Sequence, residues 1–170
     1  TTRHRIDVAV PVYIHTLDEA TAHELVHLEC ERHNLFLTEA QIKTLLRRTG
    51  GLPLAIIRTI GRMAWRGSNV ETEIQNLEDP NNQIYDFCFG KTLSLIQPGD
   101  AYYLFMTLAI FATEITREAL SFVAGFGDDW LRRDEGLSDL EVLSLCNKNN
   151  DRFGLDPLTR TQAQTKLRAH

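Results

Sequence analysis

The sequence predicts a mainly α-helical protein in two units, a four-helix bundle followed by three helices, a small β-hairpin and a last helix. Three capping boxes, at residues 16–19, 38–41 and 68–71, each place Ser or Thr three residues before Glu or Gln and so mark helix starts. A Gly-Gly-Leu-Pro run at 50–53 predicts a tight corner between two helices. A turn-forming run at 147–151 separates two short apolar segments, as in a hairpin.

The first unit covers residues 16–80. Its helices are expected to run from Thr16 to about His33, from Thr38 to the glycine pair, from Pro53 to Gly67, and from Ser68 to about Leu77. The polar run at 79–82 contains a proline and breaks the helical pattern, so it predicts the domain boundary. Short links between four short helices favour a compact bundle.

The second unit covers residues 81–170. Helices are expected over 84–96, over 100–111 with Asp100 as the cap, over 116–125, and from Ser138 to Leu143. Extended segments are expected at 143–146 and 152–155, and a final helix at 157–167. The last three of these four helices, the hairpin and the trailing helix form a winged-helix pattern.

Composition excludes several classes of protein. The net charge is −5, and residues 67–170 carry 9 Lys and Arg against 16 Asp and Glu, which disfavours binding to nucleic acid. No apolar run is long enough to span a membrane. The three cysteines are widely spaced in the sequence and fit reduced thiols, so we expect a cytoplasmic protein.

One short motif suggests a metal site. His23-Glu24-Leu25-Val26-His27 matches HExxH, which places two zinc ligands one helical turn apart with Glu24 as a general base, and His33 falls where a third ligand could follow. However, Cys30 replaces the glycine that such a site needs for the chain to turn back. We therefore predict no metal site and interpret the histidines as a solvated helix face, with a zinc peptidase as an alternative.

The segment Gly51-Leu52-Pro53-Leu54-Ala55 lies between two amphipathic helices and resembles the GLPL motif of STAND-type signalling NTPases, which include the NB-ARC switch ATPases. The apolar pattern at 108–125, at 140–145 and at 152–158 is similar to the winged-helix module of that family. Thr1-Thr2-Arg3 resembles the sensor motif at the end of a core strand. The resemblance therefore extends over nearly the whole chain.

This resemblance implies that residues 1–15 end the NTPase core strand and its connector, that residues 16–80 form a helical lid, and that residues 81–170 form a winged helix. Gly51, Leu52, Pro53 and Leu54 would line the nucleotide pocket, and Arg3 would sense its terminal phosphate. ATP or ADP with magnesium would bind to the parent protein, and the chain would act as a regulatory conformational switch. Its partners would be its own P-loop domain and downstream sensor or effector domains, and the parent could oligomerise.

Two departures from the family pattern limit this expectation. Asp156 stands where the family has a histidine that contacts the β-phosphate of ADP. A carboxylate cannot donate a hydrogen bond to a phosphate and would repel it. Such a contact would need a cation, such as Arg152 or Arg160, between the two groups. No GxxxxGK[ST] sequence occurs, so we expect a fragment of a longer protein that neither hydrolyses ATP nor binds nucleotide by itself. A winged-helix DNA-binding regulator is the other alternative.

Overall fold

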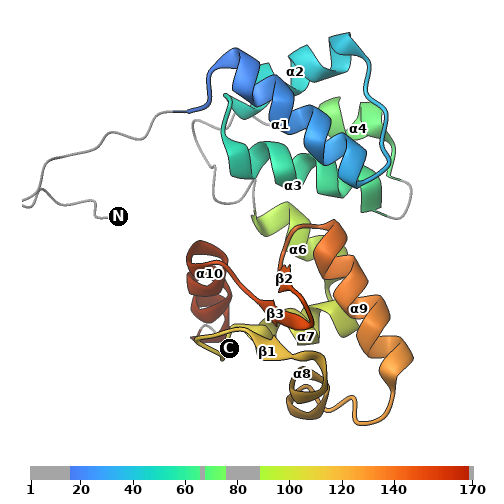
Figure 1. Cartoon of the computed structure of the whole chain (residues 1–170), viewed down its shortest axis with the longest axis vertical. Helices are drawn as coiled ribbons and strands as arrows, with labels where there is room; N and C mark the ends of the chain where they lie inside the picture. Colours follow the sequence, from blue (N-terminus) through green and yellow to red (C-terminus); the bar gives the residue numbers. More distant parts are fainter. Residues whose placement is uncertain (1–15, 66–67, 76–88, 169–170) are drawn as a thin grey trace, which may run out of the picture.

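A computed structural model describes residues 16–65, 68–75 and 89–168, which form two lobes, one above the other in Figure 1. The described chain is mainly helical with one small antiparallel sheet, as the sequence predicts. The predicted boundary at 79–82 and Arg3 lie outside the described residues. Among the helices that the structure describes, none has the length and apolar character needed to cross a membrane.

The first lobe contains four helices around one apolar core. They are α1 (Glu19–Arg32), α2 (Glu39–Thr49), α3 (Pro53–Ala64) and α4 (Val70–Gln75). Helix α3 is the most enclosed, because every residue from Ala55 to Met63 except Ile57 is buried. The core is built by α1, α2 and α3 together with Ile74 and Phe89.

The helix starts of this lobe show which caps the chain uses. The predicted capping box at Thr38 is confirmed, since its side chain and that of Gln41 cap each other's backbone. The predicted start at Thr16 is wrong: Asp18 is the N-cap and accepts from the N–H of Thr21 at 2.9 Å. The N–H of Leu17 donates to the carbonyl of Gly51 at 3.2 Å, which holds this residue outside the helix. In α4, Asn69 rather than Ser68 accepts from the first turn.

The second lobe packs five helices around a three-stranded sheet. The helices are α6 (Lys91–Ile96), α7 (Asp100–Leu108), α8 (Arg117–Val123), α9 (Trp130–Val142) and α10 (Pro157–Arg168). The strands are β1 (Ile115–Thr116), β2 (Asn147–Asn149) and β3 (Arg152–Gly154) in the order β1-β3-β2, antiparallel throughout. Phe153 of β3 pairs with Ile115 and with Lys148 and is fully buried.

Three predictions for this lobe are wrong. Helix α9 begins at Trp130 behind the cap Asp129, so Ser138 lies inside a helix rather than opening one. The segment 143–146 is not a strand, because Ser144 takes a left-handed conformation (φ 52°) and the N–H of Leu145 returns to the carbonyl of Leu140. Asp100 is the first helical residue of α7, and Gly99 holds the cap position.

The lobes meet along α3. Its Gly61 lies against the end of α9, where a Cβ atom on this glycine would be 2.5 Å from the carbonyl oxygen of Val142. The backbones of the two helices therefore approach each other more closely than any side chain would permit. This contact fixes the C-terminal half of α3 against the second lobe. In Figure 1, α3 lies on the side of the first lobe that faces the second.

Candidate functional site

The Gly-Pro corner forms as the sequence predicts. Gly50 and Gly51 both take left-handed conformations (φ 60° and 69°), and Pro53 occupies the first position of α3 after Leu52 as N-cap. Gly51 is also crowded, since a Cβ atom there would lie 3.1 Å from the carbonyl oxygen of Leu17. The corner is therefore rigid on both sides of the turn.

The corner faces outward. Pro53 is exposed, whereas Gly51, Leu52 and Leu54 are half-buried, and both leucines pack on the core of the first lobe. An interior Pro53 would have removed the corner from any contact with another domain. Its exposure leaves the predicted pocket wall open to contact.

An open groove of about 360 Å³ adjoins the corner, between α1 and α2. Leu17 and Leu46 give it apolar walls, and its charged lining consists of the cations Lys43 and Arg47 and the carboxylate of Glu19. Lys43 lies 3.9 Å from Glu39, while Arg47 makes no ion pair with any residue in the described part of the chain. The groove therefore combines apolar walls with a lining of mixed charge, in which two cations face one carboxylate.

Two arginines of α3 connect the corner helix to the second lobe. Arg58 is fully buried, and its Nη2 donates to Thr159 Oγ1 of α10 at 3.0 Å. Its guanidinium also lies 4.9 Å from the centre of the Phe89 ring. Arg62, 3% exposed, reaches Glu73 of α4 at 3.2 Å and Thr92 of α6 at 3.3 Å. One helix thus makes polar contacts with both lobes.

Asp156 lies at the other end of the Arg58 contact. It caps α10: one carboxylate oxygen accepts from the N–H of Thr159 at 2.9 Å, and the other accepts from Thr159 Oγ1. Thr159 therefore joins Asp156 to Arg58. Arg152 and Arg160 donate instead to the backbone carbonyls of Glu114 and Leu155, so neither is seen to pair with Asp156.

The structure therefore connects the Gly-Pro corner to Asp156 through a buried arginine. From Pro53 to Arg58 the helix rises about 7.5 Å. Arg58 and Arg62 were not predicted as site residues. The signal was available, because these are two cations at i and i+4 within an otherwise apolar helix, where an unpaired charge is costly.

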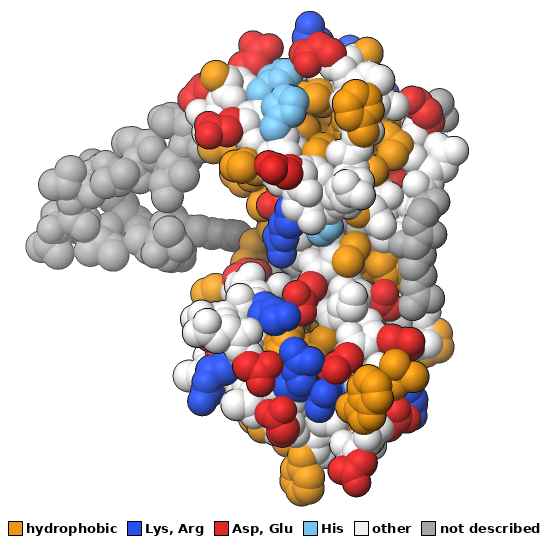
Figure 2. All heavy atoms as spheres, turned by 45° about the vertical axis from the view of Figure 1, so that its right-hand side comes forward, with side chains coloured by type: hydrophobic (Ala, Val, Ile, Leu, Met, Phe, Trp, Pro, Cys, Tyr) orange, Lys and Arg blue, Asp and Glu red, His pale blue; other side chains and the backbone are white. Residues whose placement is uncertain are grey.

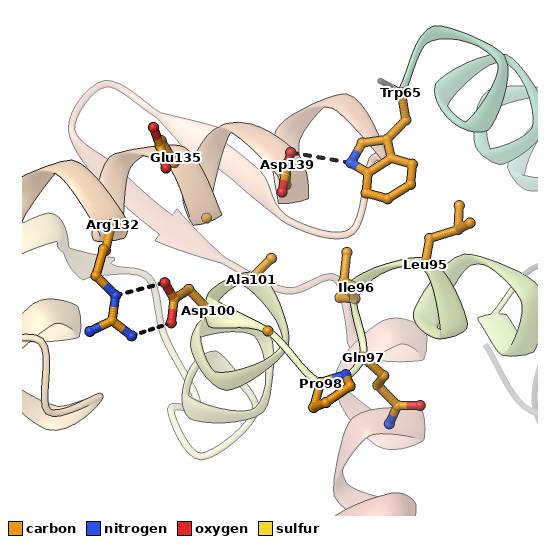
Figure 3. Close-up of a pocket in the computed structure, with 12 residues that line it drawn as sticks. Trp65, Leu95, Ile96, Gln97, Pro98, Asp100, Ala101, Arg132, Glu135 and Asp139 are labelled. Atoms are coloured by element: carbon orange, nitrogen blue, oxygen red, sulfur yellow. Dashed lines mark hydrogen bonds and ion pairs between the residues drawn. The ribbon is translucent and has the colours of Figure 1, made fainter. Parts of the chain in front are cut away.

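A second pocket, of about 210 Å³, lies where the end of α3 meets the second lobe (Figure 3). The indole Nε1 of Trp65 donates to Asp139 of α9 at 3.2 Å. At the far end Arg132 binds both carboxylate oxygens of Asp100, at 2.8 and 2.5 Å, and this pairing holds the pKa of Asp100 below its usual value. The pocket walls thus come from both lobes, with Trp65 as the contribution of the first.

The three histidines of the HExxH pattern do not converge. His23 and His27 have ring centres 6.4 Å apart, and His23 lies 4.0 Å from Glu39 of α2. The side chain of His33 is 6% exposed and lies 3.7 Å from Glu29 on its own helix. Burial lowers the pKa of His33. Within the described ranges no three His, Cys, Asp or Glu side chains are grouped so that they could hold a metal ion.

The arginines on α8 and at the start of α9 are engaged within the lobe. Arg132 binds Asp100, Arg133 binds Asp134 at 2.8 Å, and Arg117 contacts both Asp134 and Asp151. These pairs neutralise the cations that a DNA-contacting helix would direct to phosphates.

No family model, no curated protein and no solved structure matches this chain.

Proposed function

We propose that this chain is the helical lid and winged helix of a STAND-type switch ATPase, and that α3 couples the nucleotide pocket to the second lobe. The observation that carries the proposal is the path of α3. The helix starts at the exposed Pro53 and continues to Arg58 and Arg62, whose side chains bond to α10 and α6 of the other lobe.

A rigid helix is a suitable transmitting element. A change at the corner moves the whole of α3, because a hydrogen-bonded helix resists internal bending. Over its twelve residues, Pro53–Ala64, it spans about 18 Å. Its far end contacts α9 through Trp65 and Gly61. A displacement at the pocket would therefore reach the second lobe through these contacts.

The second lobe supports the winged-helix assignment by its element order. A helix, a short strand, two helices and a two-stranded hairpin follow one another as α7, β1, α8, α9, β2 and β3. Strand β3 lies between β1 and β2, so the hairpin pairs back to the strand that precedes α8. The same order is expected of a helix-turn-helix with one wing.

Asp156 takes a different role in this proposal from the phosphate-binding histidine of the family. Its carboxylate is committed to Thr159 and to the start of α10, so it orders the helix that receives Arg58. The resting arrangement would then be held by the Arg58–Thr159–Asp156 contact rather than by a direct bond to ADP. ADP would contact the Gly-Pro corner and the upstream P-loop domain.

The test extends the expressed protein through the coding sequence upstream of Thr1. A P-loop is expected within about two hundred residues, the size of one domain. Calorimetry on the extended protein should then show ADP binding that Pro53→Ala weakens about tenfold, since loss of one buried apolar contact costs about 1.4 kcal/mol or more. The chain studied here should bind ADP negligibly.

Phe36→Ala is the matched control. Phe36 is 86% exposed and lies on the same lobe as Pro53. It precedes α2, whereas the Gly-Pro corner follows the C-terminal end of α2. It should leave ADP affinity unchanged, and both variants should keep the thermal midpoint of the nucleotide-free protein. An upstream sequence without a P-loop would overturn the assignment, as would equal ADP affinity for Pro53→Ala and wild type.

A further inference from the structure

The corner between α8 and α9 carries an unusual concentration of exposed apolar side chains. Ten large hydrophobic residues are exposed in the described chain, and four of them lie within ten residues of sequence. They are Phe122 (83% exposed), Val123 (49%), Trp130 (63%) and Leu131 (54%). Orange side chains protrude at the lower end of this lobe in Figure 2, the end at which α8 lies in Figure 1. Single exposed apolar residues are ordinary, whereas a cluster marks a contact surface.

Two of these side chains form the walls of a groove. Phe122 from α8 and Trp130 from α9 line an open hollow of about 500 Å³, which Ser121 and Gly127 also line. Aromatic side chains are among those that contribute most to the free energy of protein-protein binding, because each buries a large area at low entropic cost. Phe122 and Trp130 place two of them at one groove. The hollow is wide enough for side chains of a second polypeptide.

The groove is held rigid by its own hydrogen bonds. Ser121 Oγ donates to the carbonyl of Gly127 at 3.0 Å, and the N–H of Phe126 donates to the carbonyl of Ser121 at 3.0 Å. Phe126 is buried in the lobe core, and the guanidinium of Arg132 lies 5.2 Å from its ring centre. Phe122 and Trp130 therefore extend from a fixed corner rather than from a loose loop, which lowers the cost of ordering them on binding.

The charges around the groove are unbalanced. Its cation, Arg133, is bound to Asp134 by two hydrogen bonds. Glu118 and Asp128, which also line the groove, make no hydrogen bond or ion pair through their side chains to the rest of the described chain. The charge of Glu118 acts on Arg133, but two carboxylates face one cation that is already bonded to Asp134, so the lining is net negative. This favours a positively charged partner and disfavours nucleic acid.

We propose that the α8–α9 corner, defined by Phe122, Trp130, Glu118 and Asp128, binds a basic amphipathic helix of another protein. The partner's apolar stripe lies between the two aromatic rings, and its Lys or Arg residues reach the two free carboxylates. Helix-in-groove contacts of this kind use anchors at i, i+3 or i+4 spacing. The inference is independent of the switch function, because it uses only α8, α9 and the turn between them.

The test uses the whole chain and a labelled helical peptide of about 18 leucine and lysine residues, long enough to form a helix when bound. Fluorescence anisotropy should show saturable binding that weakens with salt. Phe122→Ser and Trp130→Ser should each weaken it at least about tenfold, as expected for anchor residues. Glu118→Gln combined with Asp128→Asn should weaken it several-fold and reduce the salt dependence.

Matched controls lie on the other lobe. Leu28→Ser removes an exposed apolar side chain (56%) and Glu31→Gln an exposed carboxylate, both on α1, and neither should change binding. Equal losses for the control and corner variants would overturn the proposal. So would equal binding of a peptide with glutamate in place of lysine, or tight binding of a random DNA duplex that the corner variants weaken. A dimer in sedimentation experiments that Trp130→Ser dissociates would assign the surface to a second copy instead.

Discussion

The coupling between Arg58 and Thr159 can be measured directly. Arg58→Met keeps most of the aliphatic length and removes the charged donor, and Thr159→Val exchanges the hydroxyl for a methyl group of similar size. The single variants mix several effects, because burying a guanidinium costs several kcal/mol and its removal returns that cost. A double-mutant cycle cancels those effects and leaves the interaction between the two side chains.

The expected coupling energy follows from the geometry. The contact is 3.0 Å long, joins a charged donor to a neutral acceptor, and lies in a fully buried site. Hydrogen bonds to charged groups contribute about 1.5–3 kcal/mol. The Thr159 hydroxyl also donates a hydrogen bond to Asp156, and this bond makes the hydroxyl oxygen a stronger acceptor for Arg58. We therefore expect a coupling near the upper half of that range.

The assay is urea unfolding followed by circular dichroism on wild type, both single variants and the double variant. Thr161→Val provides the control cycle with Arg58→Met, because Thr161 is on the same helix and its hydroxyl donates to the carbonyl of Pro157. That control should couple to Arg58 by less than about 0.5 kcal/mol. A coupling of this small size for Thr159 itself would refute the role of Arg58 as the connection between the lobes.

Three further outcomes are expected. Gly61→Ala should lower the free energy of unfolding in urea by about 1–3 kcal/mol, because the new Cβ atom would be 2.5 Å from the carbonyl oxygen of Val142. Gly→Ala inside a helix normally stabilises a protein. A stabilised variant would therefore contradict the close contact of α3 with α9. Burial lowers the pKa of His33 in the folded state, so below pH 6.5 the unfolded chain takes up a proton that the folded chain does not, and stability is lost as the pH falls. His33→Gln should therefore make the free energy of unfolding fall less steeply below pH 6.5. An unchanged pH profile would count against this burial. Burial raises the pKa of the Cys146 thiol to about 12, so this side chain should react with iodoacetamide at pH 8 only after the protein is unfolded in urea. Mass spectrometry of the Cys146 peptide measures the labelling. Rapid labelling of the folded protein would contradict the burial.

Local signals in the sequence predicted those features that depend on a few neighbouring residues. Three such predictions are confirmed, because each is satisfied by groups within a few residues: the Thr38 box, the Gly50-Gly51 corner and the helix start at Pro53. In each of these positions the required partner is adjacent in the chain, so the pattern alone is sufficient.

The errors arise where a distant contact outweighs the local preference. Ser138 was expected to open a helix, yet α9 already runs through Gly136, where a Cβ atom would be 2.7 Å from a methyl carbon of Leu104. Close packing of α9 on α7 requires that glycine and carries the helix through it. Strand β2 is the polar run Asn147–Asn149, which pairs with β3. It shows no alternation of apolar and polar residues, so the sequence pattern could not predict this strand.

The site residues were predictable only in part, for a related reason. The exposed Gly-Pro corner is a continuous stretch of five residues, whereas the contact that links it to Asp156 joins positions 101 residues apart in the sequence. The aromatic corner of α8 and α9 likewise becomes visible only when exposure is known, because large aromatic side chains such as Phe122 and Trp130 are buried in most proteins.

The interface between the lobes combines tight geometry with polar chemistry, and this combination is compatible with the opening and closing that the proposed switch function requires. Arg58, Arg62 and Trp65 each contribute a hydrogen bond across it, at 3.0–3.3 Å. Such bonds contribute modestly to net stability because water replaces them on opening. Opening would also restore the hydration of Arg58, whose burial costs several kcal/mol. Separation of the lobes is therefore cheaper than unfolding of either apolar core, so a ligand that favours one arrangement at the Gly-Pro corner could shift the whole chain between two states.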